Sequence, residues 1–328
     1  MNFIEVDLAN TFFRARHVTR GNLEDKVGMS IHTVLSSIRK AWKDFNANHI
    51  VICLEGRSWR KDIYTPYKRQ RADARAAKSP KEQEEDRIFW ETFEEFKNFI
   101  ENKTNCTVLH HPSLEADDLI AGFIQKHPND NHVIISTDGD FAQLIAPNVK
   151  QYNGVLGVTV THEGYFDDKG QCVIDKKTKE VKPAPDPKWL LFEKCIRGDT
   201  SDNIFSAYPG VREKSTKNKV GLREAFSDKD SKGYNWNNLM LQRWVDHDGV
   251  EHKVIDDYNR NRILCDLSAQ PSHIRAIIDE VIDTSTNNPK NISQVGVRLL
   301  KFCAEYDLQR ISENVQSYSE PLNAKYIL

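Results

Sequence analysis

Residues 133–140 read Val133-Ile134-Ile135-Ser136-Thr137-Asp138-Gly139-Asp140. This apolar run ends on an acid, and its β-branched residues are typical of a buried strand. The runs Phe3-Ile4-Glu5-Val6-Asp7 and Ile50-Val51-Ile52-Cys53-Leu54-Glu55 end in the same way. Because an open α/β sheet binds its ligands outside the carboxyl ends of the strands, we expect these acids to converge on one place.

Acids also gather in two further clusters, Glu115-Ala116-Asp117-Asp118 and Asp199-Thr200-Ser201-Asp202. A single acid at a strand end is often a solvated loop residue, but nine in this arrangement favour a metal site. Carboxylates that crowd one cleft disfavour one another's ionised form unless divalent cations neutralise them. Oxygen ligands without His or Cys indicate Mg²⁺, with Mn²⁺ as a substitute. The predicted ligands are Asp7, Glu55, Glu115, Asp117, Asp118, Asp138, Asp140, Asp199 and Asp202.

Strand-like and helical segments alternate in the first part of the chain, which is typical of βαβ units. The pattern predicts an α/β fold with a central, mostly parallel twisted sheet flanked by helices. A polar excursion over 154–187, with a hairpin near Asp168-Lys169-Gly170, leads to a short helix at 189–197, and the chain beyond about 205 is expected to be helical. The expected strands are 3–9, 49–55, 106–111 and 132–138, and the clearest helices are 27–47, 82–102, 115–126, 257–267 and 273–283.

The helix expected at 82–102 is amphipathic, because Phe89, Phe93, Phe96 and Ile100 recur at helical spacing with charged residues between them. A stripe of this kind is typical of a face that packs on the core. The alternative is that part of it lines a passage for single-stranded bases.

Composition indicates a soluble protein of 328 residues, 39% hydrophobic and 29% charged, with no apolar run near the ~20 residues of a membrane helix. Glu5 and Asp7 interrupt the first apolar stretch, which argues against a secretory signal. None of the six cysteines has C-x-x-C spacing, and we interpret them as reduced thiols of a cytoplasmic protein.

Basic residues are segregated although the net charge is −2. The segment 57–78 holds eight basic residues and two acids, and 212–223 holds five and one. Such runs are often plain solvated surface, but here they flank the acids and favour the binding of a polyanion. The side chains expected to contact it are Arg60, Lys61, Arg69, Arg75, Lys78, Lys214, Lys217 and Lys219.

Five motifs follow one another in order: Val6-Asp7, Arg60-x-x-x-Tyr64-x-x-Tyr67-Lys68-x-x-Arg71, Glu115-Ala116-Asp117-Asp118, Ser136-Thr137-Asp138-Gly139-Asp140-Phe141-x-Gln143-Leu144 and Gly198-Asp199-x-Ser201-Asp202-Asn203-Ile204. Each is weak alone. Together, from residue 4 to about 205, they resemble the structure-specific 5′ nuclease superfamily, which includes flap endonucleases and phage 5′–3′ exonucleases such as the T-even phage ribonuclease H.

The resemblance implies a PIN-like nuclease core over 1–204 with a helical arch at about 72–100. A helical DNA-binding region with a degenerate helix-hairpin-helix would follow over 205–328. It implies divalent-metal-dependent hydrolysis of phosphodiesters near 5′ ends, with a 5′-phosphate on the product. Lys68 and Arg71 resemble the pair that grips the scissile phosphate, and Tyr67 the aromatic residue that stacks on the terminal base. The implied ligands of the first metal are Asp7, Glu115, Asp117 and Asp118, and of the second Asp138, Asp140, Asp199 and Asp202.

Two positions depart from the family pattern. Glu55 stands where the family usually has Asp, and its extra methylene shifts the carboxylate, so direct contact with a metal and contact through water both stay open. Pro209-Gly210-Val211-Arg212 replaces a Gly-Ile/Val-Gly turn, and Arg212 lacks the backbone freedom of glycine. We therefore expect no potassium site there, and expect lysine side chains to contact duplex phosphates instead.

The expected substrates are branched, nicked or flapped DNA, with an RNA–DNA hybrid as a further candidate. The expected replication partners are a single-strand-binding protein, a polymerase or a clamp. The enzyme itself is expected to be a monomer. A phage source would place it in the host cytoplasm. Two alternatives stay open: a PIN-type ribonuclease and a protein that holds branched DNA without cutting it. Asp7-Leu8-Ala9 lacks the Asp-x-Asp of a haloacid-dehalogenase-type phosphatase, and no calcium loop follows Asp138.

Overall fold

The computed structural model describes residues 1–217 and 219–327, and the chain divides into two compact units. Unit 1 comprises Met1–Ser58, Lys78–Pro185 and Ser272–Leu328, and unit 2 comprises Trp59–Ala77 and Asp186–Pro271. These units differ from the division at residue 204 that the sequence suggests. The reason is that Leu299 and Leu322, near the end of the chain, are buried in the same cluster as Ile4 and Ile50 of the central sheet.

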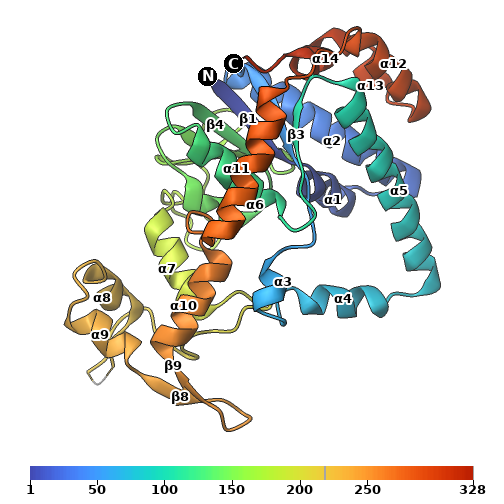
Figure 1. Cartoon of the computed structure of the whole chain (residues 1–328). Helices are drawn as coiled ribbons and strands as arrows, with labels where there is room; N and C mark the ends of the chain where they lie inside the picture. Colours follow the sequence, from blue (N-terminus) through green and yellow to red (C-terminus); the bar gives the residue numbers. More distant parts are fainter. Residues whose placement is uncertain (218, 328) are drawn as a thin grey trace. The chain divides into compact units, whose positions relative to one another are not determined.

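Unit 1 is built on a seven-stranded sheet of order β3-β2-β1-β4-β5-β6-β7 (Figure 1). The first five strands in this order are parallel, and β6 and β7 extend the sheet as an antiparallel hairpin. This confirms the mostly parallel sheet, although β5 and the hairpin strands were not predicted. The strands are β1 (Asn2–Asp7), β2 (His49–Cys53), β3 (Thr107–Leu109), β4 (Asn131–Ile135), β5 (Val149–Asn153), β6 (Val158–Thr161) and β7 (Gly164–Asp167).

Helices cover both faces of this sheet: α6 and α11 pack together on one face, while α2 lies on the other (Figure 1). The strand expected over 3–9 ends at Asp7, because the Asp7 carboxylate accepts a hydrogen bond from Asn10 N and so caps helix α1. The helices of unit 1 are α1 (Leu8–Val18), α2 (Leu23–Asp44), α5 (Pro80–Lys103), α6 (Ala116–Lys126), the 3-10 helix η1 (Gly139–Leu144), α11 (Ser272–Asn287), α12 (Val295–Glu305), α13 (Gln309–Ser312) and α14 (Val315–Asn323).

Helix α5 shows how the sequence pattern becomes packing. Ser79 and Glu82 form a capping box at its start, with Pro80 in the first turn. Phe89, Phe93, Phe96 and Ile100 are all at most 7% exposed and belong to the core of unit 1. The stripe therefore faces the core, and these four side chains do not line a passage for bases.

Unit 2 has its own hydrophobic core, in which α7 packs against α10 and Phe192 contacts Trp236 and Tyr258. Its chain is mainly helical, as expected beyond residue 205, but it also contains a two-stranded hairpin that was not predicted. The elements are α3 (Arg60–Ile63), α4 (Arg69–Ala76), α7 (Pro187–Arg197), α8 (Leu222–Ser227), α9 (Tyr234–Met240), β8 (Arg243–Val245), β9 (Glu251–Lys253) and α10 (Val254–Cys265).

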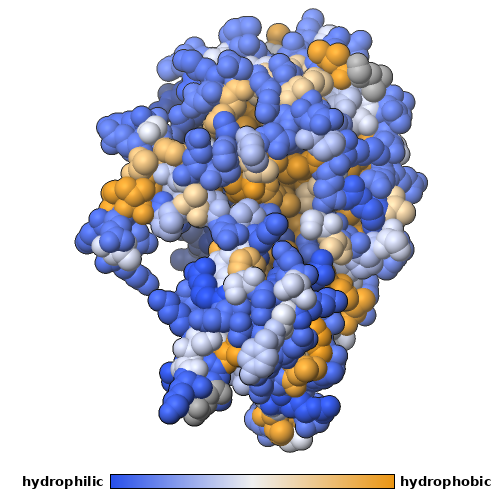
Figure 2. Space-filling view, turned by 90° about the vertical axis from the view of Figure 1, so that its left-hand side faces the viewer, coloured by the Kyte–Doolittle hydropathy of each residue, from blue (hydrophilic) through white to orange (hydrophobic). Residues whose placement is uncertain are grey.

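The polar excursion after β5 includes the turn that the sequence places near residue 169. Asp167 N donates to Gln171 O over 2.8 Å, and Gly170 has a φ of 74°. On the face shown in Figure 2, hydrophilic residues predominate and hydrophobic residues form small separate groups. Among the residues that the structure describes, no helix is long and apolar enough to cross a membrane.

Candidate metal centre

Asp7 stands at the end of β1 and is 8% exposed. One carboxylate oxygen accepts from Asn10 N at 3.2 Å, and the other from Ser136 Oγ at 3.1 Å. Burial, reinforced by the nearby carboxylates of Glu55 and Asp138, raises the pKa of Asp7 to about 7. Burial and the two neighbouring carboxylates thus disfavour the ionised form of Asp7, and a bound divalent cation would favour it.

Glu115, Asp117 and Asp118 form a second part of the site at the start of α6. Each offers a carboxylate oxygen, and these oxygens all lie within 4.8 Å of one another. Glu115 is the N-cap of the helix, and Asp118 accepts from its backbone N in a capping box. Ser58 Oγ donates to Glu115 Oε2 at 2.6 Å and orients it. Three hard oxygen donors at this spacing fit a cation such as Mg²⁺ or Mn²⁺.

Glu55 follows β2 and lies beside this group. Its Oε2 accepts from Ala116 N at 3.0 Å, so the longer side chain reaches the N-terminus of α6. Gly56 makes this approach feasible, because a Cβ there would lie 2.3 Å from His111 O and 2.5 Å from Leu114 O. The position that departs from the family pattern is thus bound to the helix that carries Glu115.

Asp138 and Asp140 begin the 3-10 helix after β4. Asp138 Oδ1 accepts from Asp140 N at 3.0 Å, which fixes their relative position. Gln151, a buried residue of β5, donates to Ser136 O at 3.1 Å and to Asp138 O at 2.6 Å. Sequence analysis missed this support because Gln151 belongs to no motif.

Asn10 was missed as well. Its Oδ1 accepts from Thr137 N at 3.0 Å and from Thr137 Oγ1 at 2.7 Å, which joins α1 to the turn that carries Asp138. The only feature of the sequence that could have indicated this role is its position three residues after Asp7. Asp7 thus ends β1, Glu55 and Asp138 follow β2 and β4, and the charges of Glu55 and Asp138 act on Asp7.

Asp199 and Asp202 belong to unit 2 and follow α7. Gly198 has a φ of 77°, and a Cβ there would lie 2.3 Å from Ile204 O, so the loop needs glycine. Asp199 Oδ2 pairs with Lys194 Nζ at 2.6 Å. Burial raises the pKa of Asp199, but Lys194 and Ser201 outweigh it and hold the value below the ordinary range. Lys194 was not among the predicted site residues.

Asp202 meets the three residues of the Tyr67-Lys68-x-x-Arg71 motif within unit 2. Arg71 Nη2 lies 2.6 Å from Oδ1, and Tyr67 donates its hydroxyl to Oδ2 at 3.1 Å. Lys68 Nζ is 3.8 Å from Oδ2. Burial raises the pKa of Asp202 in spite of Lys68 and Arg71, which lower it.

Two expectations for this region are corrected. Tyr67 is 3% exposed and belongs to the core of unit 2, so its ring is not available to stack on a base. Arg60 is 1% exposed, and its Nε donates to Leu264 O at 2.8 Å, so it supports α10 rather than presenting a charge to DNA. A motif gives residue types but not the direction in which each side chain points.

The other basic residues are placed differently. Lys61 is half-buried, and so is Lys78, which pairs with Asp86. Arg212 does not adopt a positive φ, so its backbone does not need glycine. The predicted cations that are exposed are Arg69, Arg75, Lys214, Lys217 and Lys219.

A model of the 5′–3′ exonuclease N-terminal resolvase-like domain matches residues 2–177, more than half of the chain. This chain belongs to the 5′–3′ exonuclease family. It is 30% identical over 192 residues to a 5′–3′ exonuclease of Mycoplasmopsis pulmonis, a match that covers 58% of this chain and 56% of that relative. It is 25% identical over 234 residues to flap endonuclease Xni of Shewanella woodyi, covering 69% and 79%.

Solved structures of family members show the same fold. T5 5′-exonuclease with bound zinc has a TM-score of 0.58 at 18% identity, covering 98% of this chain and all of that one. The T5 D15 flap endonuclease in complex with DNA and metal ions has a TM-score of 0.55 at 17% identity, with the same coverage. At these identities the likeness shows the α/β fold with its helical region, while the site rests on this chain's own residues.

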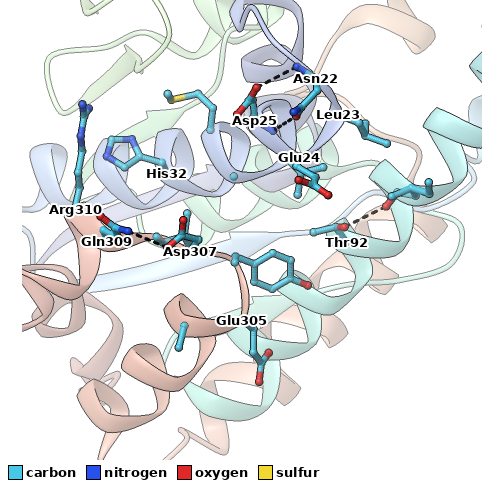
Figure 3. A pocket seen from close by; sticks show the side chains of 17 residues that line it. Asn22, Leu23, Glu24, Asp25, His32, Thr92, Glu305, Asp307, Gln309 and Arg310 are labelled. Carbon is cyan, nitrogen blue, oxygen red and sulfur yellow. Dashed lines mark hydrogen bonds between the residues drawn. The ribbon is translucent and has the colours of Figure 1, made fainter.

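A pocket of about 1070 Å³ lies elsewhere in unit 1 (Figure 3). It lies between the first turns of α2, helix α5 and the 304–310 segment, and its lining mixes acids such as Glu24 and Asp307 with Arg310. None of the predicted metal ligands lines it, and we assign it no role in the site.

Proposed function

We propose that this protein is a divalent-metal-dependent, structure-specific 5′ nuclease that acts as a 5′–3′ exonuclease and flap endonuclease. It would hydrolyse phosphodiesters near the 5′ ends of branched or nicked DNA, or of an RNA primer on DNA, and leave 5′-phosphates. The observation that carries this proposal is the convergence of acids at the ends of β1, β2 and β4, with the pKa of Asp7 raised to about 7. Membership of the 5′–3′ exonuclease family supports it.

We propose Mg²⁺ as the cofactor, with at least two ions per site. Bound ions would supply hydroxide at neutral pH and charge neutralisation for the attacking and leaving oxygens. Glu55 would contribute indirectly, since it is bound to the start of α6. The proposed ligands of the first ion are Asp7, Glu115, Asp117 and Asp118, and those of the second Asp138, Asp140, Asp199 and Asp202.

Within the chain, Lys68 and Arg71 would bind the scissile phosphate and neutralise the charge that develops on it. Tyr67 would act through Asp202, to which its hydroxyl donates, rather than by stacking. Arg69 and Arg75, both exposed on α4, would contact the single strand, and Lys214, Lys217 and Lys219 the duplex. We further propose a monomer that works in the cytoplasm, in a host cell if the source is a phage, beside a polymerase or a single-strand-binding protein.

The test is cleavage of a 5′-flap, a nicked duplex and an RNA-primed duplex, each with Mg²⁺ and with EDTA. We expect Mg²⁺-dependent products with a 5′-phosphate, and loss of cleavage in Asp138→Asn with DNA binding retained. Asp44→Asn is the matched control, because Asp44 pairs with Lys40 outside the acidic site. Binding without cleavage would favour a DNA-holding protein, and cleavage confined to single-stranded RNA would favour a PIN-type ribonuclease.

A further inference from the structure

We propose that Asp202 is a resident counter-anion of Lys68 and Arg71, which a DNA phosphate displaces when the substrate binds. The proposal rests on the proposed function, since it concerns the groups that would bind the scissile phosphate. It adds a competition within the protein that no motif indicates: the same two cations serve a carboxylate in the free protein and a phosphate in the complex.

The contacts with Asp202 converge from one short segment. Arg71 and Lys68 approach its two carboxylate oxygens at 2.6 Å and 3.8 Å, and the Tyr67 hydroxyl donates over 3.1 Å. The Asp202 side chain is 12% exposed, whereas that of Arg71 is 49% exposed. The carboxylate is thus enclosed, while the guanidinium that holds it remains accessible to a ligand from solvent.

The backbone holds this arrangement in place. Lys68 N donates to Asp202 O at 2.8 Å, and Gln70 Nε2 donates to Thr200 O at 3.1 Å and to Ser201 O at 2.8 Å. Lys68 and Asn203 both adopt left-handed backbone conformations, with φ of 54° and 58°. Non-glycine residues persist in that conformation when surrounding contacts over-determine it, so the meeting of the cations with Asp202 is built into the fold.

The chemistry of the two anions makes them competitors. A guanidinium presents its N–H groups in a planar fork that suits the oxygens of a carboxylate and of a phosphate alike. A phosphate that takes Arg71 and Lys68 leaves Asp202 without its cations. Its carboxylate then becomes available to a divalent ion, as the proposed function requires, so substrate binding would precede full use of Asp202.

Asp199 provides a matched comparison on the same loop. It carries the same charge, but it is held by Lys194 at 2.6 Å and by Ser201 Oγ at 2.7 Å, not by Lys68 or Arg71. Removing the Asp199 charge relieves general repulsion of DNA without freeing the phosphate-binding cations.

The experiment measures binding of a fluorescent 5′-flap DNA by anisotropy in EDTA. It compares wild type, Asp202→Asn and Asp199→Asn, each also in a Lys68→Ala/Arg71→Ala background. We expect Asp202→Asn to tighten binding about tenfold more than Asp199→Asn, the size of one charge-assisted hydrogen bond regained. That advantage should vanish when Lys68 and Arg71 are absent. Tyr67→Phe, which removes one anchor of Asp202 without changing charge, should tighten binding by a smaller factor.

Equal gains in Asp202→Asn and Asp199→Asn would overturn the proposal, because general repulsion would then explain both. So would an Asp202→Asn gain that persists without Lys68 and Arg71. Thermal melts confirm that each variant folds. Because binding is measured without metal, cleavage by wild type with Mg²⁺ on the same DNA tests the proposed function separately. An absence of cleavage would refute that function and leave the competition result standing.

Discussion

Asp7 shows how one residue can serve both fold and site. Its carboxylate caps α1, which favours the ionised form, yet burial and the charges of Glu55 and Asp138 raise its pKa to about 7. The folded protein therefore holds a proton on this group that the unfolded chain releases above its ordinary pKa of 3.8. The cost of ionising Asp7 in the metal-free protein is a stability cost, and a bound cation would remove it.

Asp7→Asn should change the pH dependence of stability in EDTA. The pKa of Asp7 is higher in the folded protein than in the unfolded chain. The free energy of unfolding of wild type should therefore fall as pH rises from about 4 to 7 and level off above. Between pH 5 and pH 8 the loss should be about 3 kcal/mol at most, from roughly two pKa units at 1.36 kcal/mol each. Urea unfolding at the two pH values measures it. Parallel curves for wild type and variant would contradict the assignment.

Helices α4 and α5 follow one another but differ in what stabilises them. Helix α4 has no side-chain cap and buries no residue, and it carries Arg69, Arg71 and Arg75. Helix α5 has a capping box and buries an aromatic stripe. Short helices without packing are marginal in water, so the two elements should have different local stabilities.

Hydrogen exchange should resolve this difference. Gln70 and Arg71 tie the first turn of α4 to the 200–202 loop, so we expect the amides of its second turn to exchange fastest. Those in the buried half of α5 should approach the protection of global unfolding. Exchange of metal-free protein, followed by mass spectrometry of peptides from the two helices, measures it. Flapped DNA should slow exchange in α4 if Arg69 and Arg75 contact the strand. Equal protection of both helices in the free protein would contradict the expected difference in local stability.

Within α5, the contribution of an aromatic residue to the free energy of unfolding should depend on whether it faces the core or the solvent. Phe96 is completely buried, whereas Trp90 is 38% exposed and stacks on Phe13. Phe96→Ala should lower the free energy of unfolding by about 3–5 kcal/mol, as expected for a large core deletion. Trp90→Ala should cost less than half as much, because solvent already reaches the ring. Urea denaturation of both variants measures this, and a larger loss at Trp90 would refute the packing interpretation.

At the scale of the whole molecule, the chain passes between the two units four times, at Ser58–Trp59, Ala77–Lys78, Pro185–Asp186 and Pro271–Ser272. Each unit has a hydrophobic core of its own. Segments that are distant in sequence therefore share a unit, as do the Tyr67–Arg71 segment and Asp202. Proposed duplex binding belongs to unit 2, where exposed Lys214, Lys217 and Lys219 lie.

The salt dependence of DNA affinity should show whether these lysines contact phosphates. Each phosphate contact releases counterions from DNA, so each Lys→Ala change at 214, 217 or 219 should lower the slope of log K against log[salt] by about 1. Lys176→Ala, on the polar excursion of unit 1, is the control and should leave the slope unchanged. Replacing Na⁺ with K⁺ at constant ionic strength should alter affinity little. A large K⁺-specific gain would show that the turn at Gly210 binds a cation in spite of Arg212.

Local pattern was enough to predict the parallel strands β1, β2, β3 and β4, the core-facing stripe of α5 and the acids that end the strands. Burial and hydrogen bonding along a few adjacent residues select these features, so they leave a periodic or terminal signal in the sequence. The antiparallel hairpin β8–β9 left no such signal, because its strands are three residues long and little buried.

The direction and partners of individual side chains required long-range contacts. Gln151 supports Asp138 from the next strand, and Ser58 orients Glu115 from 57 residues away. Tyr67 turns into the core to meet Asp202, 135 residues along the chain. A motif constrains which residue types are present, but the energy of a contact depends on which surfaces the folded chain brings together. Arg60 and Tyr67 thus share a motif with Lys68 and Arg71, and packing alone determines that the first two are buried.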